Sequence, residues 1–360
     1  MRQNIFKKGE EFHQFLMEIS KNHKTISFIG PDRASGKTTT LKAFLQALKD
    51  RRVGVTSIGT DHQSIKNPKE DHRLIYISEG TVVATSRNSL NACDTTKEIL
   101  HTTGIQTPSG EIIIFKAKSA GHVFLAGPSM IADSIRIRDL LFAAGAEFVL
   151  IDGAVDRKSS AFPGHTDAIV YTASLFWQGE DCPQDLLTRE IGTITTPVVE
   201  DENLREICLQ HTNKAVPYFI VDVTGRVSFP QKGKTKNELI TTLSHFDKDI
   251  QAIYIEGALT NSFIAALIKA DKKITARLAD TRIIVEDPTK LFVSPSSRLN
   301  LLNMFIHLRV LKPIKILAIS LIPCKTGMDK DQVKNLLKDH ADRFHLPVID
   351  SMGGIYVEGI

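Results

Sequence analysis

The chain has few cysteines and no long apolar run, and each shortage excludes a class of protein. No stretch reaches the ~18 apolar residues that a membrane span needs, and the first residues lack the apolar core of a secretory signal. The four cysteines are far apart and form no C-x-x-C pair: Cys93, Cys182, Cys208 and Cys324. We therefore expect buried thiols in a reduced, cytoplasmic protein without a membrane partner.

Charge of one sign is also scarce. The 45 Lys and Arg residues nearly balance the 41 Asp and Glu residues, and they are scattered along the chain. A basic block that could bind nucleic acid is absent, so we expect no nucleic-acid partner. The 12 histidines include no H-E-x-x-H spacing, which argues against a zinc enzyme.

What the chain does have is an alternation of short apolar runs and amphipathic segments. Runs such as Thr25–Gly30 and Glu147–Asp152 are typical of buried strands, and the segments between them repeat apolar residues at helical spacing. This alternation predicts an α/β fold with a parallel sheet. Two hairpins are also expected, one joining Glu111–Ala117 to His122–Ala126 and one within Tyr218–Phe229.

The length of 360 residues suggests about two domains. The polar stretch from Trp177 to Gln184 is the best candidate for a linker. We therefore expect a nucleotide-binding domain with an N-terminal helix at residues 1–176, and a second α/β domain at residues 177–360.

The strongest motif is FIGPDRASGKTTT, residues 28–40, in which a predicted strand leads through a tight loop into a predicted helix. Small residues allow backbone N–H groups to surround a phosphate, and the helix N-terminus adds partial positive charge. A lysine at this point reaches the β- and γ-phosphates, and the next hydroxyl ligates magnesium. The expected nucleotide-binding residues are Gly30, Arg33, Ala34, Ser35, Gly36, Lys37, Thr38 and Thr39.

The spacing of this motif departs from the common G-x-x-x-x-G-K-[ST] pattern. Pro31 stands where the first glycine is usual, and Gly30 lies one residue earlier. The longer loop resembles that of dethiobiotin synthetase and its relatives, within the P-loop NTPases that include signal-recognition GTPases and septum-site ATPases. The septum-site branch carries an extra lysine where this chain has Asp32, so a mechanism that uses this lysine is not expected.

Two aspartates are candidates for the magnesium site. Asp61 follows the second predicted strand, and Asp152 ends the run EFVLID. Carboxylates at the carboxyl ends of parallel strands are where an α/β sheet binds its ligands. We therefore predict Thr38, Asp61 and Asp152 as metal-site residues, and Lys37 and Asp152 as catalytic residues.

The identity of the base and of further charged groups follows less directly. The only Asn-Lys pair, Asn213-Lys214, does not continue as N-K-x-D, the guanine-reading motif. The expected cofactors are therefore ATP and Mg2+. Arg157 could neutralise phosphate charge or form a surface ion pair. The segments Gly127–Ser129 and Pro295–Arg298 could line a pocket or cap helices.

Several stretches together resemble a narrower family: GPDRASGKTT, VGVTSIGTD, EGTVVATS, TGIQTPSGEIII, HVFLAGPS, VLIDGAVDRKSSAFPGHTDAIV and VEDPTKLFV. They are similar to P-loop proteins encoded beside the cobalamin-dependent lysine and ornithine aminomutases of amino-acid-fermenting bacteria. The resemblance implies an ATPase subunit of a factor that reactivates the aminomutase, together with a second reactivase subunit.

Two other functions remain open. One is a small-molecule kinase or ligase of the dethiobiotin-synthetase kind, which carries a substrate lysine just after its second strand. Here Val53–Ser64 contains no lysine, and Lys66 comes late. The other is a nucleotide-binding regulator that hydrolyses nothing useful.

Overall fold

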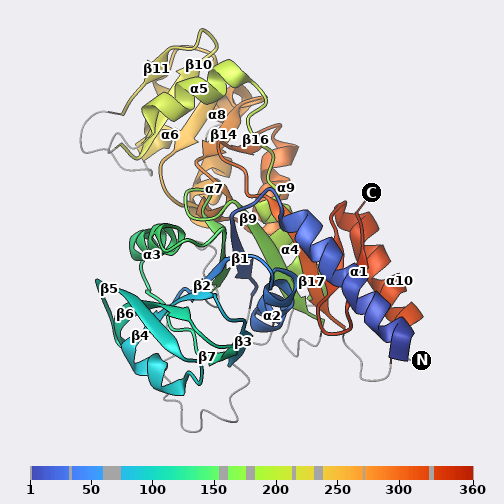
Figure 1. The fold of residues 1–360 in the computed structure, drawn as a ribbon. Helices are drawn as coiled ribbons and strands as arrows, with labels where there is room; N and C mark the ends of the chain where they lie inside the picture. The colour runs from blue at the N-terminus through green and yellow to red at the C-terminus, as the bar shows by residue number, and fades with distance from the viewer. Residues whose placement is uncertain are drawn as a thin grey trace. The chain divides into compact units, whose positions relative to one another are not determined.

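The computed structural model describes residues 2–31, 35–59, 74–153, 161–175, 183–212, 216–230, 238–270, 272–323 and 328–359. The chain divides into two compact units, each described here by itself (Figure 1). The first comprises Met1–Gln184 and Lys315–Ile360, and the second comprises Asp185–Ile314. No helix in the described ranges combines the length and the apolar character needed to cross a membrane.

The first unit is built on a ten-stranded sheet in the order β19-β18-β17-β9-β1-β8-β2-β4-β6-β5. From β18 to β4 all neighbouring strands are parallel, while β19, β6 and β5 run antiparallel at the two edges. The strands of this sheet are β1 (Thr25–Ile29), β2 (Val53–Ser57), β4 (Val82–Ser86), β5 (Lys97–Thr107), β6 (Gly110–Ala117), β8 (Phe148–Asp152), β9 (Ala168–Ser174), β17 (Ile316–Ile322), β18 (Val348–Asp350) and β19 (Ile355–Val357). The expected α/β fold with a mostly parallel sheet is thus confirmed.

Helices cover both faces of this sheet, which is why its central strands are apolar throughout. Phe28 of β1 packs edge-on against Phe44, with ring centroids 5.1 Å apart, in one core. On the opposite face, Ile137 and Leu141 pack against Val149. The helices of this unit are α1 (Arg2–Ser20), α2 (Lys37–Ala47), α3 (Ile131–Ala143) and α10 (Lys330–Phe344), with the 3-10 helix η2 at Arg87–Ala92.

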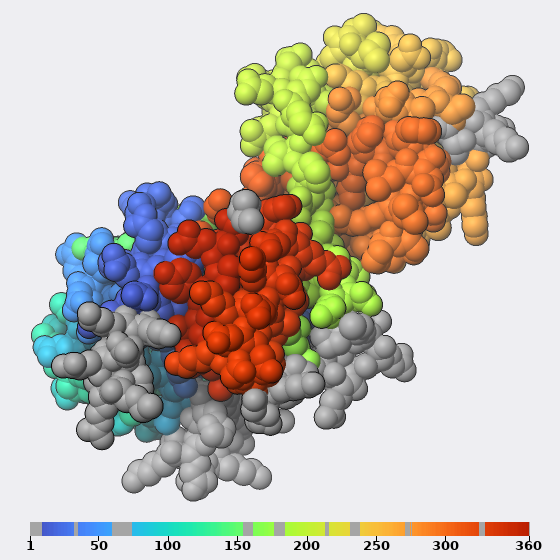
Figure 2. Space-filling model, turned by 90° about the vertical axis from the view of Figure 1, so that its right-hand side faces the viewer, coloured from blue at the N-terminus to red at the C-terminus, as the bar shows by residue number. Residues whose placement is uncertain are grey.

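The two ends of the chain meet in the first unit. The Phe15 ring of α1 stacks on the Tyr356 ring of β19, with centroids 4.2 Å apart. Figure 2 shows the blue N-terminal helix beside the red C-terminal segment.

This return of the chain differs from the expected second domain at residues 177–360. Strand β17 pairs with β9, with Ile319 opposite Tyr171, so residues from Lys315 onward belong to the first sheet. The second unit is therefore an insertion between two neighbouring strands. Apolar periodicity predicts that a segment is a buried strand, but it does not indicate which sheet the strand joins.

The hairpin expected between residues 111–117 and 122–126 is wrong. β6 pairs with β5 and β4, whereas β7 (Gly121–Val123) pairs with β3 (Ile75–Ile77) in a separate two-stranded sheet. The sequence did not reveal β5 because this edge strand is mostly exposed and carries polar side chains at both faces.

The second unit has a five-stranded sheet in the order β11-β10-β12-β14-β16. The expected hairpin at residues 218–229 is confirmed by antiparallel pairing of β10 with β11, and β12, β14 and β16 are parallel. A further two-stranded sheet joins β13 to β15. The bounds are β10 (Tyr218–Asp222), β11 (Val227–Ser228), β12 (Ile250–Ile255), β13 (Leu259–Thr260), β14 (Arg282–Val285), β15 (Leu291–Phe292), β16 (His307–Val310), α4 (Pro183–Ile194), α5 (Glu202–His211), α6 (Leu239–Ser244), α7 (Asn261–Ile268), α8 (Lys272–Arg277), η5 (Pro288–Lys290) and α9 (Pro295–Asn303).

Candidate functional site

The candidate site lies at the carboxyl ends of β1, β8 and β2, where α2 begins (Figure 1). The loop from β1 to α2 carries most of the residues predicted to bind phosphate. Gly36 precedes the helix with φ 92°, a left-handed conformation that favours glycine. The helix then starts at Lys37, so its unpaired N–H groups face this loop.

The start of the loop is pressed against β9. A Cβ atom on Gly30 would lie 2.3 Å from the Thr172 carbonyl oxygen and 2.5 Å from Ser35 Oγ. The Ser35 and Thr172 hydroxyl oxygens are 3.1 Å apart, and Thr172 Oγ1 donates to the Ile29 carbonyl oxygen at 3.1 Å. Gly30 is therefore required by this close approach, although it lies one position before the usual first glycine.

Lys37 brings a positive charge into the first turn of α2. Its residue is only 6% exposed, and Nζ donates to Ser35 Oγ at 3.0 Å. A cation at a helix N-terminus is unfavourable by roughly 0.3–1 kcal/mol, because the helix dipole is positive there. A buried ammonium group beside free helix N–H groups favours an anion at this loop.

Asp152 ends β8 directly opposite this cationic loop. Thr38 Oγ1 donates to Asp152 Oδ2 at 3.0 Å, which joins the first turn of α2 to the sheet. Burial raises the pKa of Asp152 to about 6, while the Thr38 hydrogen bond and the charges of Lys37 and Lys42 oppose this rise. The backbone is closely packed here, since a Cβ on Gly153 would lie 2.3 Å from the Phe28 carbonyl oxygen.

Ser57 is a neighbour of Asp152 that the sequence did not single out. The two residues are opposite each other in the parallel pairing of β2 and β8, so their side chains lie on the same face of the sheet. The Ser57 hydroxyl is buried and has no hydrogen-bond partner in the structure as described. An unsatisfied buried hydroxyl costs about 1–3 kcal/mol, so its position next to Asp152 suits a site that gains a polar ligand.

The described residues hold no group of three or more His, Cys, Asp or Glu side chains that could bind a metal ion. That donor set fits Mg2+ at a phosphate site, because phosphate oxygens, water and one hydroxyl supply most of the ligands there. Thr38 and Asp152 are suitably placed protein groups for such an ion.

Not every predicted site residue can be compared with the structure. Arg33, Ala34, Asp61 and Arg157 lie outside the described residues, as do Asp32, Lys66 and the Asn213-Lys214 pair. Thr39 lies in the first turn of α2 and is partly exposed.

The two segments that could line a pocket or cap helices have structural roles. Gly59 N donates to the Pro128 carbonyl oxygen at 2.8 Å, so residues 127–129 close the end of β2. Ser294 Oγ accepts from Ser297 N at the start of α9. Arg298 donates to the Gly192 carbonyl oxygen at 3.0 Å. Helix capping therefore accounts for the second segment.

Thr172 and Ser57 are the site residues that sequence reasoning missed. Their shared signal is a small polar side chain in or at the end of an otherwise apolar strand. That signal is weak, because such residues are common and only strand order shows which of them face the loop.

The fold and the site together define an α/β protein with a mostly parallel sheet and a cationic loop–helix junction at the sheet's carboxyl edge. Comparisons with protein-family models, curated proteins and solved structures found no significant match.

Proposed function

We propose that the first unit binds ATP with Mg2+ through a phosphate-binding loop at residues 30–39 and hydrolyses the nucleotide. The observation that carries this proposal is the contact between Thr38 and Asp152, 3.0 Å long, beside the buried Lys37. These three residue types, joined in this way at a helix N-terminus, are the parts that phosphate-binding loops use for nucleotide and magnesium.

Each residue has a distinct role in this proposal. The N–H groups at the start of α2 hold the phosphates, and Lys37 extends from Ser35 to the β- and γ-phosphate oxygens. The Thr38 hydroxyl ligates magnesium, and Asp152 accepts a hydrogen bond from a water in the ion's shell. Bound magnesium neutralises charge on the phosphates. Asp61 is proposed for the same shell on its sequence position alone.

We further propose that nucleotide turnover drives a switch that acts on a partner protein. The resemblance to reactivating factors suggests a cobalamin-dependent lysine or ornithine aminomutase, with a second reactivase subunit. A nucleotide shifts a conformational equilibrium only if the two states bind it differently. The second unit carries no recognised nucleotide motif, which makes it the natural candidate for partner contacts.

The test of this partner role is ATP turnover by the purified full-length chain, with and without a candidate aminomutase. We expect hydrolysis that the aminomutase stimulates. Phosphate transfer to a small molecule, without stimulation by protein, would instead support a kinase or ligase of the dethiobiotin-synthetase kind and reject the switch.

Nucleotide binding itself is tested by Lys37→Ala. At a free ATP concentration of 100 Kd the wild-type chain gains about 2.7 kcal/mol in unfolding free energy, and we expect the variant to lose this gain. Thermal denaturation with and without Mg-ATP measures it. Lys338→Ala, at an exposed position of α10, is the matched control and should respond like wild type. Equal stabilisation of both variants would reject the site.

A further inference from the structure

A second concave site lies beside the C-terminal half of α2. It is a cavity of about 190 Å3 between α2, the start of β2 and β3. One face of α2 contributes Lys42, Gln46 and Lys49, which lie three and four residues apart and so share a side of the helix. The floor is apolar, while Tyr76 and Ser78 add hydroxyl groups.

The charge of this cavity has one sign. Its lining residues include Lys42, Lys49 and Arg51 and no Asp or Glu. Arg51 is largely matched, because it donates to Glu147 Oε2 at 2.8 Å and lies 5.0 Å from the centre of the Phe148 ring. The two lysines therefore supply most of the field. Burial lowers the pKa of Lys42, so part of its hydration is already lost.

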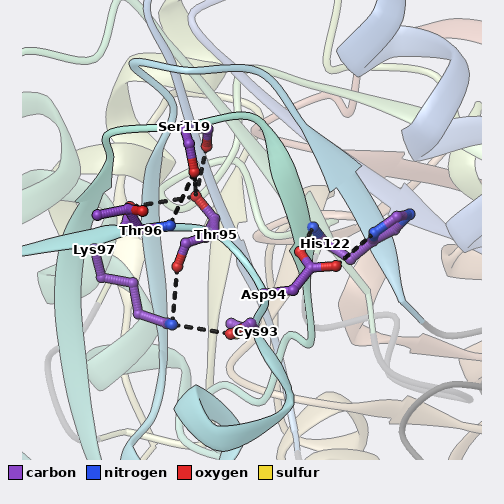
Figure 3. Close-up of polar contacts among 7 residues, drawn as sticks. All are labelled: Cys93, Asp94, Thr95, Thr96, Lys97, Ser119 and His122. Atoms are coloured by element: carbon purple, nitrogen blue, oxygen red, sulfur yellow. Dashed lines mark hydrogen bonds and ion pairs between the residues drawn. The ribbon is translucent and has the colours of Figure 1, made fainter.

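The β3 side of the cavity is held firmly. The Tyr76 ring meets the His122 ring edge-on, with centroids 5.4 Å apart. His122 Nδ1 lies 3.1 Å from Asp94 Oδ2 (Figure 3). In the same cluster Thr96 N donates to Ser119 Oγ at 3.0 Å, which ties the η2–β5 loop to the β6–β7 loop. The hydroxyl-bearing wall is thus formed before any ligand arrives.

This cavity is separate from the proposed nucleotide site. Gln46 follows Lys37 by nine positions on one helix, which corresponds to about 14 Å along the axis at ~1.5 Å per residue. A phosphate held by Lys37 and the first turn of α2 therefore does not occupy the cavity. The carbonyl end of α2 does not itself attract anions, so binding here has to come from the lysines and hydroxyls.

We propose that this cavity binds a small oxyanion, the carboxylate or phosphate group of a metabolite. Two lysines provide charge, and the amide and hydroxyl groups provide directed hydrogen bonds. Its volume is below the ~300 Å3 at which drug-sized ligand pockets begin, which limits the ligand to a small molecule or a single head group.

The experiment uses the full chain carrying Lys37→Ala, so that phosphate cannot bind strongly at the loop. Thermal denaturation and titration calorimetry are run with inorganic phosphate and with succinate, against sodium chloride of equal ionic strength. We expect saturable binding of at least one probe. Binding of phosphate alone identifies phosphorylated ligands, and binding of succinate alone identifies carboxylates.

In the same background, Lys42→Gln with Lys49→Gln should weaken that binding at least tenfold. The matched control, Lys334→Gln with Lys338→Gln, changes two exposed lysines of α10 and should leave it unchanged. If the double variant does not fold, Tyr76→Phe, an exposed position, provides the test with an expected few-fold loss. Absence of binding by both probes, or equal loss in the control, overturns the proposal. ATP binding by wild type is measured separately, so either proposal can fail alone.

Discussion

Asp152 in the first unit and Asp287 in the second begin from the same sequence pattern. Each follows an apolar parallel strand, β8 or β14, and burial raises the pKa of each carboxyl group. On sequence alone, VLID and IIVED are equally good candidates for a ligand-binding acid at the carboxyl edge of a sheet.

Their partners differ. Asp152 accepts a hydrogen bond from Thr38, more than a hundred residues earlier in the chain. Asp287 accepts from the backbone and hydroxyl of Thr289, at 2.7 and 2.5 Å, and so caps the short helix η5. An acid whose partner comes from a distant loop joins two elements of a site, whereas one that binds its own turn serves local structure.

The largest effect should come from removing each carboxylate in turn. We expect Asp152→Ala to lower Mg-ATP affinity and turnover by about 100-fold, because the ion's water shell loses its acceptor. Asp287→Ala should leave both unchanged and lower the unfolding free energy by about 1–2 kcal/mol, the usual value of a lost cap. Calorimetric titration and thermal denaturation measure the two quantities. The reverse assignment of effects would break the comparison.

A second difference concerns pH in the nucleotide-free protein. The pKa of Asp152 rises from 3.8 to about 6 on folding, so the folded chain binds more protons between these values. Its unfolding free energy should therefore fall as pH rises from about 4 to 6 and then level off. At about 1.4 kcal/mol per pKa unit, the fall is at most about 3 kcal/mol.

The measurement is the unfolding free energy from pH 4 to 7, compared between wild type and Asp152→Asn. The difference between the two curves should shrink or grow across that window as the carboxyl titrates. Parallel curves would show that Asp152 is not perturbed in the folded protein.

The smallest expected effect concerns the unpaired hydroxyl beside Asp152. Ser57→Ala should reduce Mg-ATP affinity a few-fold, while stability stays equal or rises by up to about 1 kcal/mol, because an unsatisfied buried group is removed. Ser27→Ala is the matched control, since this β1 hydroxyl is also buried without a described partner but lies within the strand. Equal losses in both variants would exclude a role for Ser57 at the site.

Much of the fold could be predicted from the sequence because its signals are local. The strands at β1, β8 and β9, the helix α2 and the hairpin β10–β11 all follow from apolar runs, helical spacing and turn residues. Strand β5 could not be predicted in this way, since its exposed residues show no apolar alternation. For the same reason β6 was assigned to the wrong neighbour.

For the candidate site, the sequence by itself determined the order strand, loop, Gly36-Lys37-Thr38, helix. That order follows from residue types a few positions apart. Only the tertiary structure decided that Asp152 reaches Thr38, that Thr172 supports the loop and that Ser57 lies beside the carboxylate. It also decided that β17 returns to pair with β9. The physical reason is that an apolar pattern records which residues are buried, whereas the neighbour of each strand depends on pairing between segments far apart in the chain.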